Sequence, residues 1–339
     1  MNRFLALPAD DRRRWCEEAG ARLGLEAPSL EKDFWVCWTL RELFSLQEIG
    51  ERLTFKGGTS LSKGWKLIER FSEDVDVVVD REYLGFSGDN TPENARSNSE
   101  RDRRLEAVLE ACAELVKGPL RQALYERCRA ALPAAGDWDL SEDPDDADGQ
   151  TLLLQYPTAF PPGGHLRRVV KIELGARSDT EPSLRPTIRP YLAEALPGEI
   201  PDSDFALRAV APERTFWEKA MLLHEETYCA GPEGPKPRLS RHYYDLWCLI
   251  RVGVAERAAA DKALFDRVAD HRRLFFRRRR EAQDTLRRGA LRLVPPADQL
   301  SHWRRDYDSM RGAMFFGEPP QFAEILGVVG RFQEGFNER

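Results

Sequence analysis

The sequence lacks the features that mark a membrane, secreted or zinc-binding protein. No apolar run approaches the ~20 residues that a bilayer-spanning helix needs, and the N-terminus has no apolar stretch long enough for a signal peptide. The six cysteines form no C-x-x-C pair, and the five histidines show no H-E-x-x-H spacing. We therefore expect a cytoplasmic protein with reduced, mostly buried thiols, no membrane partner and no zinc site.

A large excess of one charge is also missing, although two segments are strongly charged. The net charge of −6 over 339 residues does not describe a general polyanion-binding protein. Residues 137–149 are acidic and contain Pro and Gly, so we expect an exposed loop, with a partner surface as the alternative. Residues 271–292 are basic, and the run Arg277–Arg280 predicts a solvated helix face, with contact to RNA phosphates as the alternative.

The spacing of apolar residues predicts a mixture of helices and strands without internal repeats. Helices are expected in the first 50 residues, over 59–70, over 101–133, and in four segments after residue 205, the third near 271–288 and the last near 320–336. Strands are expected at 52–56, 74–80, 151–160 and 167–177. At a prior of roughly 150 residues per domain, the length suggests two domains, the first built on a mixed sheet and the second helical.

Two glycines stand directly after the first expected strand and open the next helix. Glycine lets the backbone approach an anion, and free N–H groups at such a turn favour negative charge. Neighbouring hydroxyls and ammonium groups add donors, which is a pattern suited to a triphosphate; the alternative is an ordinary strand–helix turn. The candidate phosphate-binding residues are Lys56, Gly57, Gly58, Thr59, Ser60 and Lys63.

Three carboxylates are the candidate metal ligands. Asp74 and Asp76 share one face of a strand because residues two apart point the same way. Glu173 lies on the non-core face of a later strand and joins them if the two strands are neighbours. Carboxylates held this close favour a bound Mg²⁺ ion. The alternatives are a solvated sheet edge for the aspartates and a surface ion pair with a lysine or arginine for Glu173.

The order of the motifs resembles a known family. G-G, a helix, D-x-D on a strand and a later strand carboxylate are similar to the nucleotidyltransferase fold of the DNA polymerase β superfamily. The stretch "FKGGTSLSKGWKLIERFSEDVDVVVD" resembles the AbiEii/AbiGii toxin family. The resemblance continues, in the family's order, through "EKDFWVCWTL", "VVKIEL", "ERTFWEKAMLLH", "RHYYDLW" and "DYDSMRGAMFFGEPPQFAEIL".

The resemblance implies an α+β fold, with a polymerase β-like nucleotidyltransferase domain with N-terminal helices over 1–205 and a helical domain over 206–339. It also implies Lys219 as a triphosphate ligand and Asp245 as a further functional acid. From spacing alone, Lys219 could instead pair with a glutamate on the helix surface, and Asp245 with Arg241 four residues earlier.

The activity that the resemblance implies is Mg²⁺-dependent nucleotidyl transfer by a toxin of a type IV-like toxin–antitoxin system in abortive infection and phage defence. Mn²⁺ is an alternative ion, an NTP is the substrate, and the expected acceptor is RNA, with tRNA first. A cognate antitoxin encoded nearby is the expected partner. A protein hydroxyl as acceptor, and a nucleotide- or RNA-binding module without turnover, are the alternatives.

Overall fold

The structure, a computed structural model, describes residues 1–133, 137–161, 167–229, 236–276 and 279–338. The chain divides into two compact units, which we call the first and the second unit. The first unit comprises Met1–Gly64 and Ser72–Ala209, and the second comprises Trp65–Phe71 and Val210–Arg339. The short segment Trp65–Phe71 thus belongs to the second unit, although both of its sequence neighbours belong to the first.

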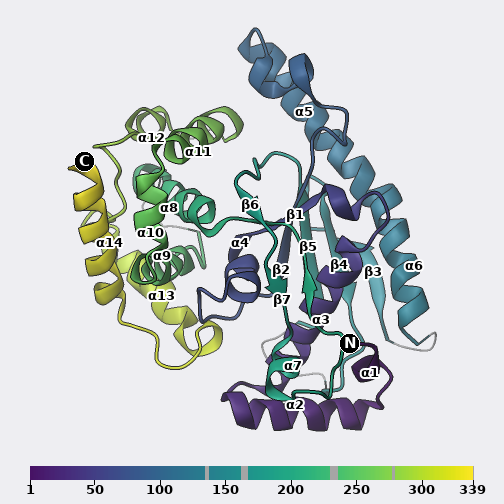
Figure 1. The fold of residues 1–339 in the computed structure, drawn as a ribbon. Coiled ribbons are helices and arrows are strands. Elements are labelled where there is room, and N and C mark those ends of the chain that lie inside the picture. The colour runs from purple at the N-terminus through teal and green to yellow at the C-terminus, as the bar shows by residue number, and fades with distance from the viewer. Residues whose placement is uncertain (134–136, 162–166, 230–235, 277–278, 339) are drawn as a thin grey trace. The chain divides into compact units, whose positions relative to one another are not determined.

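A mixed sheet forms the centre of the first unit (Figure 1), and it confirms the predicted α+β class. Strand β2 runs parallel to β5, and β1 runs parallel to β9, whereas β1–β2, β3–β4 and β4–β5 are antiparallel pairs. In sheet order the described strands are β3 (Asp139–Glu142), β4 (Thr151–Gln155), β5 (Val169–Gly175), β2 (Asp74–Val79), β1 (Leu53–Lys56), β9 (Ala209–Val210) and β6 (Ser183–Leu184). A separate pair joins β7 (Thr187–Ile188) to β8 (Phe205–Ala206).

Alternating apolar residues explain why β2 and β5 lie in the middle of this sheet. Val75, Val77 and Val79 of β2 are buried, as the period of two predicts. Val170 and Ile172 bury the matching face of β5. The opposite faces of the two strands therefore keep their carboxylates half-exposed.

Helix α3 packs on this sheet. Its side chains are buried around most of the circumference, with Phe34, Trp35 and Leu40 in the core. It contacts β2 and β5, and α2 and α7 contact α3 in turn. The helices described in the first unit are α1 (Asn2–Leu5), α2 (Ala9–Leu23), α3 (Ala27–Phe44), α4 (Gly57–Thr59), α5 (Asn98–Leu115), α6 (Arg121–Ala131) and α7 (Tyr191–Ala195).

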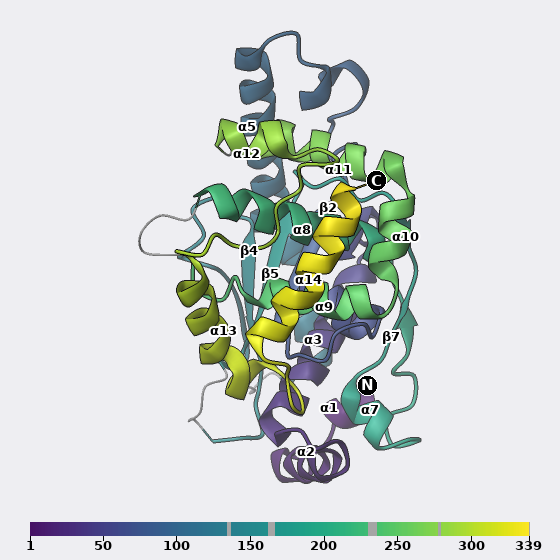
Figure 2. The same ribbon diagram turned by 90° about the vertical axis from the view of Figure 1, so that its left-hand side faces the viewer.

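The second unit consists mainly of helices. Helix α14 lies along α9, as Figure 2 shows, and α8 contacts α9, α10 and α11. Aromatic side chains, among them Trp217, Phe265 and Phe336, pack edge to face or tilted in its core. Its helices are α8 (Pro212–Cys229), α9 (Arg241–Arg251), α10 (Val254–Ala260), α11 (Lys262–Phe275), α12 (Arg280–Thr285), α13 (Leu300–Met314) and α14 (Phe322–Asn337).

Three predicted elements differ from the structure. The acidic segment 137–149 is not all loop, because Leu140 is buried and Asp139–Glu142 pairs with β4 as strand β3. The helix predicted over 59–70 ends at Gly64, after the π-helical turn Ser60–Gly64 (η2), and Lys66 takes a left-handed backbone conformation. The basic segment 271–288 is two helices, α11 and α12, and Arg277 and Arg278 lie outside the described residues.

The helices predicted over 101–133 and near 320–336 are confirmed, and so is the burial of most of the cysteines. The helical signal over 101–133 corresponds to α5, a π-helical turn (Val116–Leu120) and α6, and the last predicted helix is α14. Cys16, Cys37, Cys112, Cys128 and Cys248 are buried and free of disulfides, and the Cys229 side chain lies outside what the structure describes. Within the described chain, no helix is both long and apolar enough to cross a membrane.

Candidate active site

Three charged residues stand side by side on neighbouring strands of the first unit. Lys56 of β1 pairs in register with Asp76 of β2. Asp76 pairs in turn with Glu173 of β5 in the parallel ladder. The sequence predicted that Glu173 joins Asp74 and Asp76 if their strands are neighbours. The structure shows that β5, which carries Glu173, is the neighbour of β2, which carries the two aspartates.

The carboxyl group of Asp76 is electrostatically unusual. Burial, followed by the nearby carboxylates of Glu173 and Asp74, raises the pKa of Asp76 to about 7, and Lys56 opposes this shift. Asp76 and Glu173 share a side-chain hydrogen bond, which requires a proton on one of the two carboxyl groups. A cation could replace that proton, so the pair is suited to binding a metal ion near neutral pH.

Gly57 is fitted to this carboxyl group. It has a φ of +81°, which glycine adopts without steric cost. A Cβ atom at this position would lie 2.9 Å from Cγ of Asp76 and closer still to Oδ2. The backbone of the Gly-Gly turn can approach the Asp76 carboxylate only because residue 57 has no side chain.

Glu173 also forms an ion pair with a lysine, which was the alternative to metal binding in the sequence analysis. Lys171 Nζ lies 2.8 Å from Glu173 Oε1 and 3.5 Å from Asp143 Oδ2. In the described chain, no three His, Cys, Asp or Glu side chains already converge as a metal-binding cluster. The donor set nevertheless fits a hard cation, because the carboxylates of Asp76 and Glu173 adjoin and Asp74 lies on the same face of β2.

The hydroxyls of the Gly-Gly turn are engaged within the first unit. Thr59 is buried, and its Oγ1 donates to the backbone oxygen of Asp74 at 2.5 Å. Ser60 Oγ donates to the carbonyl of Gly57 at 2.9 Å. These bonds hold the turn against the start of β2, whereas Lys56 Nζ donates to Ser178 Oγ at 2.9 Å and stays partly exposed.

The structure gives Lys63 a buried partner. Its Nζ lies 2.6 Å from Oδ1 of Asp33 and 3.3 Å from the centroid of the Tyr191 ring. Burial opposes the charge, but Asp33 outweighs burial and holds the pKa of the Lys63 ammonium above its usual value. Since Lys63 and Asp33 are almost completely buried, we do not include Lys63 among the phosphate ligands of the site proposed below.

Removing Asp33 should strongly destabilise the first unit. Asp33→Ala would leave the ammonium of Lys63 buried without its carboxylate, and loss of one partner of a buried pair costs about 3–5 kcal/mol. Urea unfolding followed by circular dichroism measures the change. As a control, Asp10→Ala removes the partner of Arg13 in an exposed pair with N···O of 3.8 Å and should change stability by less than about 1 kcal/mol. Equal stability of the two variants would contradict this assignment.

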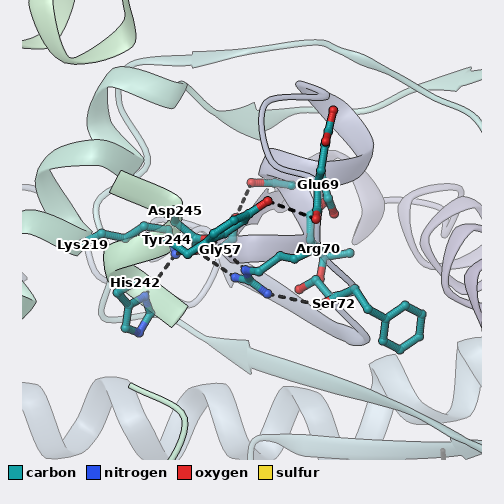
Figure 3. Close-up of polar contacts among 12 residues, drawn as sticks. Gly57, Glu69, Arg70, Ser72, Lys219, His242, Tyr244 and Asp245 are labelled. Atoms are coloured by element: carbon teal, nitrogen blue, oxygen red, sulfur yellow. Dashed lines mark hydrogen bonds and ion pairs between the residues drawn. The ribbon is translucent and has the colours of Figure 1, made fainter. Parts of the chain in front are cut away.

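Lys219 and Asp245 form a buried network within the second unit (Figure 3). Lys219 Nζ lies 2.8 Å from Asp245 Oδ2 and 3.3 Å from His242 Nδ1. Arg70 donates two hydrogen bonds to Asp245, Nε to Oδ1 at 2.7 Å and Nη2 to Oδ2 at 2.8 Å. Asp245 therefore binds Arg70 and Lys219, which differs from the pairing with Arg241 that spacing allowed.

The ionisation of this network follows from its burial. Burial lowers the pKa of Lys219, and Asp245 opposes that shift. The pKa of Asp245 lies well below its usual value, because Arg70 and Lys219 outweigh the effect of burial. Burial and the adjacent Lys219 ammonium lower the pKa of His242, so a neutral imidazole accepts from Lys219.

Four residues that contact the predicted site residues were not predicted from the sequence: Asp33, Arg70, Ser178 and His242. Each contacts a predicted site residue across a long sequence separation, for example 175 residues between Arg70 and Asp245. Local periodicity carries no information on such pairs. A signal for two of them was present, since Asp33 lies in the "EKD" motif and His242 in the "RHYYDLW" motif.

The comparison with protein families decides the identity. A family model described as "Nucleotidyl transferase AbiEii toxin, Type IV TA system" matches residues 38–328. The chain belongs to the AbiEii toxin family. It is thus a nucleotidyltransferase toxin of a type IV toxin–antitoxin system, as the motifs predicted. Membership in the AbiEii family implies a nucleotide substrate and an antitoxin partner.

One solved structure shares the fold of this chain. The chain is 19% identical to MenT4, a nucleotidyltransferase toxin from Mycobacterium tuberculosis H37Rv, with a TM-score of 0.51 over 98% of this chain and 91% of MenT4. A second match, JHP933 from Helicobacter pylori, is 14% identical with a TM-score of 0.35, over 90% of this chain and 94% of JHP933. No curated protein matches the chain.

Proposed function

We propose that this AbiEii protein transfers a nucleotide from an NTP to a hydroxyl group of RNA, with a tRNA 3′ end as the first candidate, and requires Mg²⁺. The observation that carries the proposal is the register between Asp76 and Glu173, which sets two carboxyl groups side by side beside the Gly-Gly turn. The motif resemblance supports RNA as the acceptor.

Asp74, Asp76 and Glu173 would hold the metal. When bound, Mg²⁺ would neutralise charge on the triphosphate and on the oxygens that develop charge during transfer. The raised pKa of Asp76 means that metal binding displaces a proton from the Asp76–Glu173 pair near neutral pH. The apparent affinity for Mg²⁺ should therefore rise with pH up to about 7 and level off above it.

Each remaining residue has a role that follows from its chemistry. The backbone at Gly57 and Gly58 would approach the triphosphate, Lys56 would offset its charge, and Thr59 and Ser60 would fix the turn. Glu173 would accept the proton of the attacking hydroxyl. That oxygen would bond to the α-phosphorus as the bond from the α-phosphorus to the bridging oxygen breaks, and pyrophosphate would leave.

Lys219 and Asp245 complete the proposal. The Lys219 ammonium would bind the triphosphate, which is the role that the family resemblance implies. Asp245 would hold the Lys219 ammonium in its charged form, since the carboxylate lies 2.8 Å from Nζ and opposes the effect of burial.

Nucleotide transfer can be measured directly. The protein is incubated with each α-³²P-labelled NTP, Mg²⁺ and total cellular RNA, beside the double variant Asp74→Ala, Asp76→Ala. We expect label in RNA with the wild type and none with the double variant, and digestion of the product with RNase or protease identifies the acceptor. Absence of label in every fraction, or equal labelling by the double variant, would exclude the proposed reaction. Label that resists RNase and is removed by protease would replace RNA by a protein hydroxyl.

A further inference from the structure

The segment Trp65–Phe71, which we call the connecting segment, links the two halves of the nucleotidyltransferase motif. It follows the Gly-Gly turn and η2, which end at Gly64, and it precedes β2, which begins at Asp74. The turn and the strand belong to the first unit, whereas the connecting segment belongs to the second. The chain therefore leaves the first unit between its two motif halves and returns to it.

Backbone hydrogen bonds fix the connecting segment within the second unit. The N–H of Phe71 donates to the carbonyl of Met314 at 2.7 Å, and the N–H of Phe316 donates to the carbonyl of Glu69 at 3.1 Å. The hydroxyl of Tyr244 donates to the same carbonyl of Glu69 at 3.1 Å, as Figure 3 shows. These bonds lie on both sides of residue 70.

Arg70 is the side chain that holds this arrangement. It is 3% exposed, and its guanidinium makes a two-bond fork with an Asp245 carboxylate that is fully buried. Such planar two-bond pairs are strong and geometrically specific, and a lysine cannot reproduce them. Asp245 also pairs with Lys219, so one carboxylate joins the connecting segment to the lysine that the family resemblance implicates in phosphate binding.

We propose that Arg70 is a positioning residue of nucleotide transfer: its fork with Asp245 fixes the connecting segment and thereby the start of the D-x-D strand, where Asp74 stands. This inference rests on the proposed function. Asp74 lies three residues beyond Phe71, and the turn is bonded to Asp74 through Thr59. If the connecting segment were released, the position of Asp74, a proposed metal ligand, would change as well, because only two residues separate Asp74 from Phe71.

The test compares two buried arginines of the second unit. Arg70→Lys keeps the charge and removes the fork. Arg272→Lys does the same at a fork with Glu225, with bonds of 2.8 and 2.6 Å, that does not involve the connecting segment. Because a shift of about 1 Å can cost about 10²-fold in rate, we expect kcat of Arg70→Lys to fall by about that factor. KM for the NTP should stay within about threefold, since the loss is in alignment rather than in ground-state binding.

Hydrogen–deuterium exchange supplies a second readout. In Arg70→Lys the amides of residues 65–71, Phe71 above all, should exchange faster than in the wild type. In Arg272→Lys the same amides should keep the wild-type rate, and kcat should stay within about threefold of wild type.

The outcomes separate this role from the proposed function. If the wild type transfers no nucleotide, the proposed function and the role of Arg70 fail together. If the wild type is active but Arg70→Lys matches Arg272→Lys in kcat, only the role of Arg70 fails. Unchanged exchange over 65–71, or a loss confined to KM, would also overturn it.

Discussion

Replacing Asp76 with asparagine should abolish nucleotide transfer and at the same time stabilise the metal-free protein at pH 8. Activity is lost because an amide is a poor ligand for Mg²⁺ in place of a carboxylate. Stability rises because the amide removes a half-buried charge beside Glu173 and keeps nearly the same shape. At about 1.4 kcal/mol per pKa unit, the raised pKa of Asp76 corresponds to about 4 kcal/mol. Because the Asp76 side chain is only half-buried, solvent screening reduces the expected gain in the free energy of unfolding to about 2 kcal/mol.

The size of this gain should depend on pH. The folded-state pKa of Asp76, about 7, lies above the ordinary value of 3.8. Between these values the folded protein holds a proton that the unfolded chain has lost, so stability of the wild type falls as pH rises from about 4 to about 7. The advantage of Asp76→Asn should grow over this range and stay constant above it. Urea unfolding in EDTA at pH 5 and pH 8 measures both effects.

A suitable control for Asp76→Asn is Asp80→Asn, because Asp80 follows the same strand but lies outside the site. Its carboxylate is 3.8 Å from an exposed Arg52 guanidinium. Loss of this weak pair should change the unfolding free energy by less than about 1 kcal/mol and leave transfer active. The prediction is contradicted if Asp76→Asn is less stable than the wild type at pH 8, or if it keeps transfer activity.

Gly57→Ala should reduce transfer by more than about 10²-fold, because the new methyl group displaces the Asp76 carboxylate. The added Cβ would lie too close to Asp76 for any rotation of the methyl group to relieve. The residue would also adopt a positive φ, which costs an alanine about 1 kcal/mol or more. Steady-state kinetics with a labelled NTP, together with urea unfolding, measures the two consequences.

Gly85→Ala is a matched control for backbone strain alone. Gly85 has a φ of +87° and nothing within 4 Å of an added Cβ. Both variants should lose stability by a comparable amount from strain, whereas only Gly57→Ala should lose activity. If both lose activity equally, the close approach of Gly57 to Asp76 is not what the reaction needs.

Much of the site could be predicted from local pattern. The period of two placed Asp74 and Asp76 on one face and Val75 and Val77 in the core, as the structure has them. The same reasoning placed Glu173 on the face opposite Ile172. These predictions hold because strand geometry determines which side chains share a face, whatever the neighbouring strand is.

The predicted secondary structure was wrong at two segments whose conformation depends on contacts with other parts of the chain. The helical spacing of Trp65 and Ile68 predicted a helix through residue 70. In the structure the helix ends at Gly64, and backbone hydrogen bonds join Glu69 and Phe71 to Phe316 and Met314 of the second unit. The acidic composition of 137–149 predicted a loop, but Leu140 is buried and the backbone of β3 pairs with β4. In both places contacts with distant residues override the local preference.

The sequence by itself determined the family, the α+β class and the face on which each carboxylate stands, because motif order and periodicity are properties of the chain. Only the tertiary structure decided the partners of these residues. It set Asp76 in register with Glu173, bound Lys63 to Asp33, and joined Arg70 to Asp245. The physical reason is that charges attract across space, and the fold alone determines which residues, distant in the chain, are brought close enough to pair.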